Sequence, residues 1–92
     1  MKLNDKLIAT YETGGGTIHI EGEFTITHIT KCFMYLTMTK EGFYCQYDGW
    51  VKRKIPLLDF KYRKEPMPKW LSETEFVCYH NGSGTPTVYK KI

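Results

Sequence analysis

Residues 17–38, TIHIEGEFTITHITKCFMYLTM, keep a strict two-residue rhythm. Eight of the eleven even positions in this stretch are apolar, compared with three of the eleven odd positions. Because successive side chains of a β-strand point to opposite sides of the sheet, such alternation is typical of strands with one buried face. The stretch therefore predicts β-structure in which the even positions face the core.

The same stretch is too long to be one strand. At about 3.3 Å per residue, 22 residues in a single strand would exceed the width of a domain of this size. Gly22 and the pair Thr30-Lys31 are the predicted interruptions. A tight two-residue turn would exchange the buried and exposed positions, yet the even positions stay apolar throughout. We therefore expect bulges or odd-length loops at these breaks.

Strand and turn signals continue on both sides of this stretch. The triple glycine at 14–16 predicts a loop, and the segments 40–42 and 48–49 have the composition of hairpin turns. The predicted strands outside the first stretch are 6–12, 43–47, 50–55, 57–64, 75–80 and 87–92. With 32–39, the strands 43–47 and 50–55 form a central three-stranded meander. The expected fold is all-β, a small antiparallel barrel or two-layer sandwich, with residues 1–92 as a single domain.

Composition is that of a folded protein with one modest core. The chain has 92 residues, of which 41% are hydrophobic and 25% charged. A net charge of +3 permits a nucleic-acid partner without requiring one. There is no signal-peptide pattern and no apolar run long enough for a membrane span, and three cysteines do not form a disulfide framework. These features predict a cytoplasmic protein with reduced thiols and no membrane partner.

The two hairpin turns predict which side chains share a face of the meander. The core side is expected to join Ile18, Ile20, Phe24 and Ile26 with Met34, Leu36, Met38, Tyr44, Gln46, Val51, Arg53 and Ile55. The opposite face is expected to carry Phe33, Tyr35, Phe43, Cys45, Tyr47, Trp50, Lys52 and Lys54. This second face combines aromatic rings with lysines at one end.

An aromatic and basic sheet face suits two kinds of partner. Rings stack on bases while cations meet phosphates in single-stranded nucleic-acid binders, and tyrosine and tryptophan also dominate protein-binding hot spots. Alternatively, a second layer of the protein covers this face, which would then be buried and not a binding surface. If segment 57–64 lies beside 50–55, Lys61 and Arg63 extend the basic stripe, although lysines also protect edge strands from aggregation. The candidate binding residues are Phe33, Tyr35, Phe43, Tyr47, Trp50, Lys52, Lys54, Lys61 and Arg63.

Metal and catalytic chemistry have weaker support in the sequence. Cys78 and His80 share a strand face, and Cys32, Cys45 or His28 would have to complete a zinc site, but the chain lacks a Cys-x2-Cys clasp. Cys45 and a histidine could act as nucleophile and base, but nothing in their spacing along the sequence distinguishes them from any other cysteine and histidine. Glu21 and Glu23, with His19 on the same face, are expected to mark a solvated turn. The glycine-rich segment 80–85 precedes a strand, so it is predicted to be a hairpin loop rather than a phosphate cradle. We expect no metal, cofactor or catalytic residue.

These observations favour a non-enzymatic binding module. We expect an inhibitor or adaptor, of the kind that phages and plasmids encode, which binds a protein partner through the aromatic and basic sheet face. A single-stranded nucleic acid or a nucleotide-like ligand on the same face is the alternative.

Overall fold

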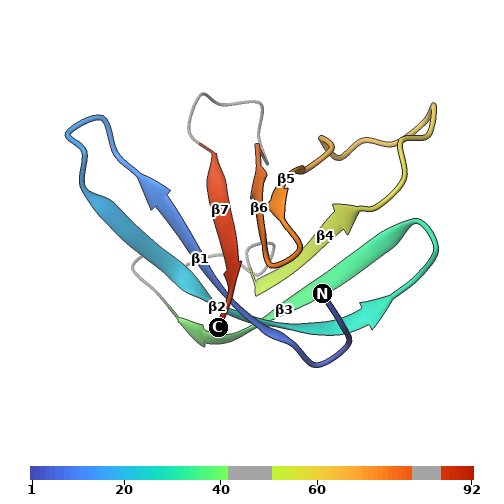
Figure 1. The fold of residues 1–92 in the computed structure, drawn as a ribbon, viewed down its shortest axis with the longest axis horizontal. Helices are drawn as coiled ribbons and strands as arrows, with labels where there is room; N and C mark the ends of the chain where they lie inside the picture. Colours follow the sequence, from blue (N-terminus) through green and yellow to red (C-terminus); the bar gives the residue numbers. More distant parts are fainter. Residues whose placement is uncertain (42–50, 80–85) are drawn as a thin grey trace.

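The computed structural model describes residues 1–41, 51–79 and 86–92, which form one antiparallel sheet. Its strands are β1 (Lys6–Glu12), β2 (Ile18–Ile29), β3 (Phe33–Glu41), β4 (Lys52–Pro56), β5 (Lys69–Ser72), β6 (Glu75–Cys78) and β7 (Thr87–Lys91). They are arranged in the order β4-β3-β2-β1-β7-β6-β5. The sheet curls strongly into a half-barrel (Figure 1). Buried side chains from separate strands, such as Phe24 and Tyr89, meet on its concave side. The expected all-β, antiparallel fold is confirmed.

The meander differs from the predicted one in its middle strand. β3 pairs directly with β4, with Tyr35 opposite Lys54 and Thr37 opposite Lys52. β2 pairs with the other side of β3, so β2 and β4 are the two neighbours of β3 in the described sheet. The strand predicted at 43–47 itself falls outside the described residues. The meander in the structure is β2-β3-β4.

A β-bulge in β2 explains which predicted core residues are buried. Ala9 pairs with Gly22 and Thr10 with Ile20, so Glu21 is an extra residue in β2. One inserted residue makes every preceding side chain of the strand point to the opposite face of the sheet. Phe24 and Ile26, after the bulge, are fully buried as predicted, whereas the side chains of Ile18 and Ile20 are 68% and 48% exposed. The prediction that these two isoleucines belong to the core is wrong for this reason.

Gly22 suits its position beside the bulge because atoms of the adjacent strand β3 approach it closely. A Cβ at this position would lie 2.9 Å from the carbonyl oxygen of Lys40 and 2.9 Å from the Met38 side chain. Such distances leave no room for a side chain without displacing backbone. Gly22 is therefore a packing requirement inside a continuous strand. Of the two alternatives predicted at this interruption, a bulge or an odd-length loop, the structure has the bulge.

The core fills the concave side of the sheet. Met34, Leu36 and Ile55 are buried as predicted, and Met38 packs partly against them. Among the described residues, the buried core cluster comprises Leu7, Ala9, Phe24, Ile26, Met34, Leu36, Ile55, Phe76, Cys78 and Tyr89. Arg53 also lies on the core side, where the alternation placed it. The buried faces of β3 and β4 thus follow the sequence rhythm.

The segment between β4 and β5 is not the strand predicted at 57–64. The Arg63 backbone N–H donates to the Phe60 carbonyl at 3.3 Å, and the Arg63 side chain pairs with Asp59 at 2.8 Å. These local contacts make turns, so alternation alone was misleading here. The strand β5 was missed because its four residues, KWLS, do not alternate between apolar and polar side chains.

The last predicted hairpin is present. β6 and β7 pair as expected, although β6 ends at Cys78 and β7 at Lys91. The predicted hairpin loop at 81–86 lies outside the described residues except for Pro86.

Candidate binding face

The outer face of β2, β3 and β4 gathers four of the predicted binding residues. Tyr35 lies opposite Lys54, and Thr37 lies opposite Lys52. Leu36 and Arg53, which lie between them in sequence, are buried on the other side. Phe33 lies two residues before Tyr35, with 6.2 Å between the ring centroids. The register therefore brings Phe33, Tyr35, Lys52 and Lys54 onto one surface, here called the β2–β4 face.

A second bulge adds His28 to this face. Ile26 pairs with Leu36 while His28 pairs with Tyr35, so Thr27 is an extra residue and the facing changes again. The His28 and Tyr35 ring centroids are 5.5 Å apart. Sequence alternation put His28 on the buried side. Only the pairing with β3 shows that it points outward, and no local sequence signal marks this bulge.

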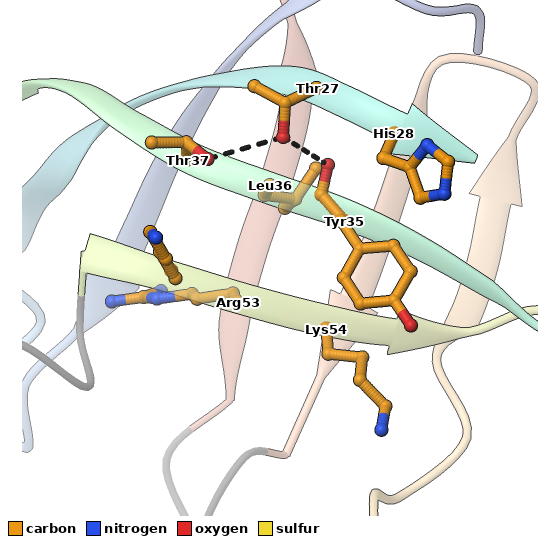
Figure 2. Close-up of a pocket in the computed structure, with 8 residues that line it drawn as sticks. Thr27, His28, Tyr35, Leu36, Thr37, Arg53 and Lys54 are labelled. Atoms are coloured by element: carbon orange, nitrogen blue, oxygen red, sulfur yellow. Dashed lines mark hydrogen bonds between the residues drawn. The ribbon is translucent and has the colours of Figure 1, made fainter. Parts of the chain in front are cut away.

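A shallow pocket of about 470 Å³ lies on the β2–β4 face (Figure 2). Its lining consists of Thr27, His28, Tyr35, Leu36, Thr37, Lys52, Arg53 and Lys54. The hydroxyls of Thr27 and Thr37 share a hydrogen bond of 3.2 Å. Among the described residues that line the pocket there is no carboxylate. Its exposed groups are therefore hydroxyls, two rings and two ammonium groups.

The aromatic rings of the face pack against their neighbours. The Lys54 ammonium lies 4.1 Å from the centroid of the Phe33 ring, and Phe60 meets the same ring edge-on at 5.5 Å. Lys54 also pairs with Glu65 at 3.4 Å. A cation over an aromatic face is attracted by the ring quadrupole. These contacts hold Lys54 and Phe33 in place and occupy one face of the Phe33 ring.

The remaining predicted binding residues lie elsewhere or are not described. Arg63 is engaged by Asp59 and by the Glu65 carbonyl oxygen, and the Lys61 ammonium lies 5.6 Å from the Tyr62 ring. The strand that would align both cations with Lys52 and Lys54 does not exist. Phe43, Tyr47 and Trp50 fall outside the described residues.

A buried ion pair anchors β4 behind this face. Arg53 Nη1 donates to Glu21 Oε2 at 2.7 Å and to the Tyr89 hydroxyl at 2.7 Å. The Thr87 hydroxyl donates to the same carboxylate at 3.3 Å. The Arg53 guanidinium also lies 4.6 Å from the centroid of the Phe24 ring. These contacts connect β4 to β2 and β7 across the concave side of the sheet.

The ion pair corrects the expectation of a solvated turn at Glu21 and Glu23. The bulge turns Glu21 into the core, whereas Glu23 pairs with Lys40 at 3.6 Å. His19 stacks on Tyr11, with 5.3 Å between the ring centroids. The two carboxylates are thus separated and do not form a paired acid–base site.

The cysteines and histidines considered for zinc are not brought together among the described residues. Cys32 and Cys78 are free thiols, and within residues 1–41, 51–79 and 86–92 no group of three potential ligands gathers. Cys45 and His80 fall outside these ranges. Cys78 is instead a core side chain, with its Sγ 4.0 Å from the Pro66 carbonyl oxygen.

Burial of Cys78 predicts a loss of stability at alkaline pH. Desolvation raises the pKa of its thiol from 9.0 to about 11. The folded state therefore retains this proton where the unfolded state releases it, so stability falls as the pH rises from 9 to 11. At pH 10.5 we expect the Cys78 contribution to be about 2 kcal/mol lower than at pH 8.

Urea unfolding of the wild type and Cys78→Ala at both pH values measures this contribution. Other groups titrate equally in both proteins. The difference between the two proteins in how the free energy of unfolding changes with pH therefore isolates the contribution of Cys78. Equal losses of stability in the two proteins would contradict the prediction.

No protein-family model, curated protein or solved structure matches this chain. The part of the chain that the structure describes has no helix long and apolar enough to cross a membrane.

Proposed function

We propose that this protein is a non-enzymatic binding module, an inhibitor or adaptor, that docks a protein partner through the β2–β4 face. The observation that carries the proposal is the grouping of His28 and Tyr35 with Lys52 and Lys54 around a pocket without a carboxylate in its described lining. Tyrosine is enriched in interface hot spots, and like-signed charges at the rim select the partner's charge. The expected partner presents an acidic surface. A cytoplasmic location, expected from the cysteine content, is part of this proposal.

The arrangement of the rings favours a protein over a nucleic acid. Base stacking uses open ring faces as platforms. Here one Phe33 face lies under Lys54, its edge meets Phe60, and Tyr35 is tilted against both Phe33 and His28. Such a packed cluster offers partly exposed apolar area and a polar rim, as protein interfaces do.

Single-stranded nucleic acid is the second candidate because of the polar groups in the pocket. Thr27 and Thr37 contribute two hydroxyls to the pocket lining, which also includes Lys52, and hydroxyls and lysines are common phosphate contacts. Binding of this kind would weaken steeply with salt.

Replacing Tyr35 by Ala together with Lys52 by Glu is expected to weaken partner binding by about 30-fold or more, the size of a hot-spot loss. The experiment captures partners from cell extract on immobilised protein and then measures the affinity of the purified partner by calorimetry. Tyr62→Ala with Lys61→Glu is the matched control, because it removes an exposed tyrosine and lysine away from this face. Circular dichroism establishes that both variants fold.

Nuclease treatment separates the two candidates. A protein that stays bound after nuclease treatment, and is lost only with the Tyr35 and Lys52 variant, supports the proposal. Equal loss in the control variant would place the interface elsewhere. Salt-dependent binding of labelled single-stranded RNA or DNA, lost with the same variant, would replace the proposal with the nucleic-acid candidate.

A further inference from the structure

One part of the pocket on the β2–β4 face combines two hydroxyl groups with a lysine. Lys52 lies directly opposite Thr37 in the β3–β4 ladder, and the Thr37 hydroxyl lies 3.2 Å from that of Thr27. Directly opposed residues on one face of a sheet have Cβ atoms about 5 Å apart, which is within the reach of a lysine side chain. All three side chains line the pocket. They are here called the Thr–Lys corner.

The two hydroxyls of this corner have one proton that is only weakly engaged. Thr27 and Thr37 carry two hydroxyl protons, and one of them lies in the bond between the two oxygens. A further acceptor is the Tyr35 backbone carbonyl oxygen, 3.5 Å from Thr27 Oγ1. Hydrogen bonds from hydroxyls usually span about 2.5 to 3.0 Å, so this contact is weak. When Thr27 donates to Thr37 instead, the Thr37 proton is left for the oxygen of a ligand.

The charge of this corner is not balanced by a carboxylate among the described residues. Lys54 pairs with Glu65 at 3.4 Å, and its side chain extends away from the two threonines (Figure 2). The ion pairs within residues 1–41, 51–79 and 86–92 do not include Lys52. A single monoanion would therefore balance the corner. A phosphate monoester carries a charge of about −1.5 to −2 at neutral pH and would leave an excess of negative charge.

We propose that the Thr–Lys corner binds one carboxylate of the protein partner, at the end of an aspartate or glutamate side chain. The Lys52 ammonium and the Thr37 hydroxyl donate, and a carboxylate accepts through both of its oxygens. The Tyr35 ring, which lines the same pocket, offers apolar surface to the carbon stem of the acidic side chain. This inference rests on the proposed function and names the group that the face recognises. Because exposed ion pairs are weak singly, the contact selects the partner and does not hold it alone.

Titration of the ¹⁵N-labelled protein with N-acetylglutamic acid amide, followed by amide NMR shifts at constant ionic strength, tests this site. We expect the shifts to be centred on Thr37 and Lys52, with a dissociation constant of about 10 to 100 mM. N-acetylglutamine amide has nearly the same shape without the charge. It should bind about threefold more weakly or worse.

Two substitutions with matched controls locate the binding groups. Lys52→Gln and Thr37→Val should each weaken binding of the glutamate probe about threefold or more. Lys61→Gln and Thr39→Val make the same changes at exposed positions outside the pocket lining, so they should bind like the wild type. The amide spectrum of each variant shows whether it is folded.

The outcomes separate this site from the proposed function. Equal binding of the acid and its amide, or unchanged binding in Lys52→Gln, overturns the carboxylate site. Tighter binding of inorganic phosphate, or of dimethyl phosphate, which has the single charge of a nucleic-acid backbone unit, overturns it as well. Probe binding at the corner without a captured protein partner keeps the site and contradicts the proposed function. A partner that is lost with the Tyr35 and Lys52 variant, but binds Lys52→Gln and Thr37→Val like the wild type, does the reverse.

Discussion

Replacing either Glu21 or Arg53 by Ala is expected to lower the free energy of unfolding by about 3 to 5 kcal/mol, the cost of leaving one member of a buried ion pair alone. Both side chains are less than a tenth exposed, and their charged atoms are 2.7 Å apart. Burial works against the charged form of Arg53, but Tyr89 and Glu21 outweigh it and raise the pKa of the guanidinium. Arg53 therefore stays charged, and without Glu21 its charge has lost its counter-ion.

The double variant Glu21→Gln with Arg53→Met is the control for this prediction. It removes both charges together, so it should recover a large part of the loss seen in the single variants. Urea unfolding followed by circular dichroism measures all four proteins. Single variants that cost less than 1 kcal/mol would show that water reaches the pair, contrary to its burial in the structure.

The ion pair also matters for the binding face. Arg53 lies between Lys52 and Lys54 in β4, and its side chain crosses the core to β2 and β7. Because neighbouring residues of a strand point to opposite sides, anchoring Arg53 inward directs the two lysines outward. The pocket on the outside and the ion pair on the inside thus depend on the same short strand.

Sequence alternation predicted the fold where pairing is regular. Leu36, Arg53 and Ile55 were placed on the core side and are buried there. β1 was predicted with the bounds that it has in the structure. In these strands the burial of a side chain depends only on its position in a two-residue pattern, which can be read directly from the chain.

Alternation failed at the two bulges of β2. At each bulge an extra residue enters the strand through its hydrogen bonding to β1 or β3. The sequence predicted a bulge or an odd-length loop at Gly22 but not its effect on the facing of the preceding residues, and it contains no signal for the bulge at Thr27. Ile18 and Ile20 were therefore misplaced into the core and His28 away from the binding face. Glu21 and Arg53, separated by 32 positions, meet for the same non-local reason.

Replacing Phe76 by Ala is expected to cost about 3 to 5 kcal/mol of unfolding free energy, the usual range for a fully buried phenylalanine. Phe76 is 0% exposed and lies between two other rings. It stacks on Tyr89 with 4.8 Å between centroids and 12° between ring planes, and it is tilted against Trp70 at 4.8 Å. Its removal opens a cavity that borders β5, β6 and β7 and takes away the main support of Trp70.

Phe76→Leu separates the loss of volume from the loss of ring contacts. This variant keeps most of the apolar volume and should cost less than half as much as the alanine variant. Trp70 fluorescence, measured in a Trp50→Phe background, should shift to longer wavelength in Phe76→Ala as the indole becomes wetter. A destabilised Phe76→Ala protein with unchanged Trp70 emission would mean that β5 is held by its pairing with β6 alone. In that case the aromatic stack contributes to the core without positioning the sheet edge.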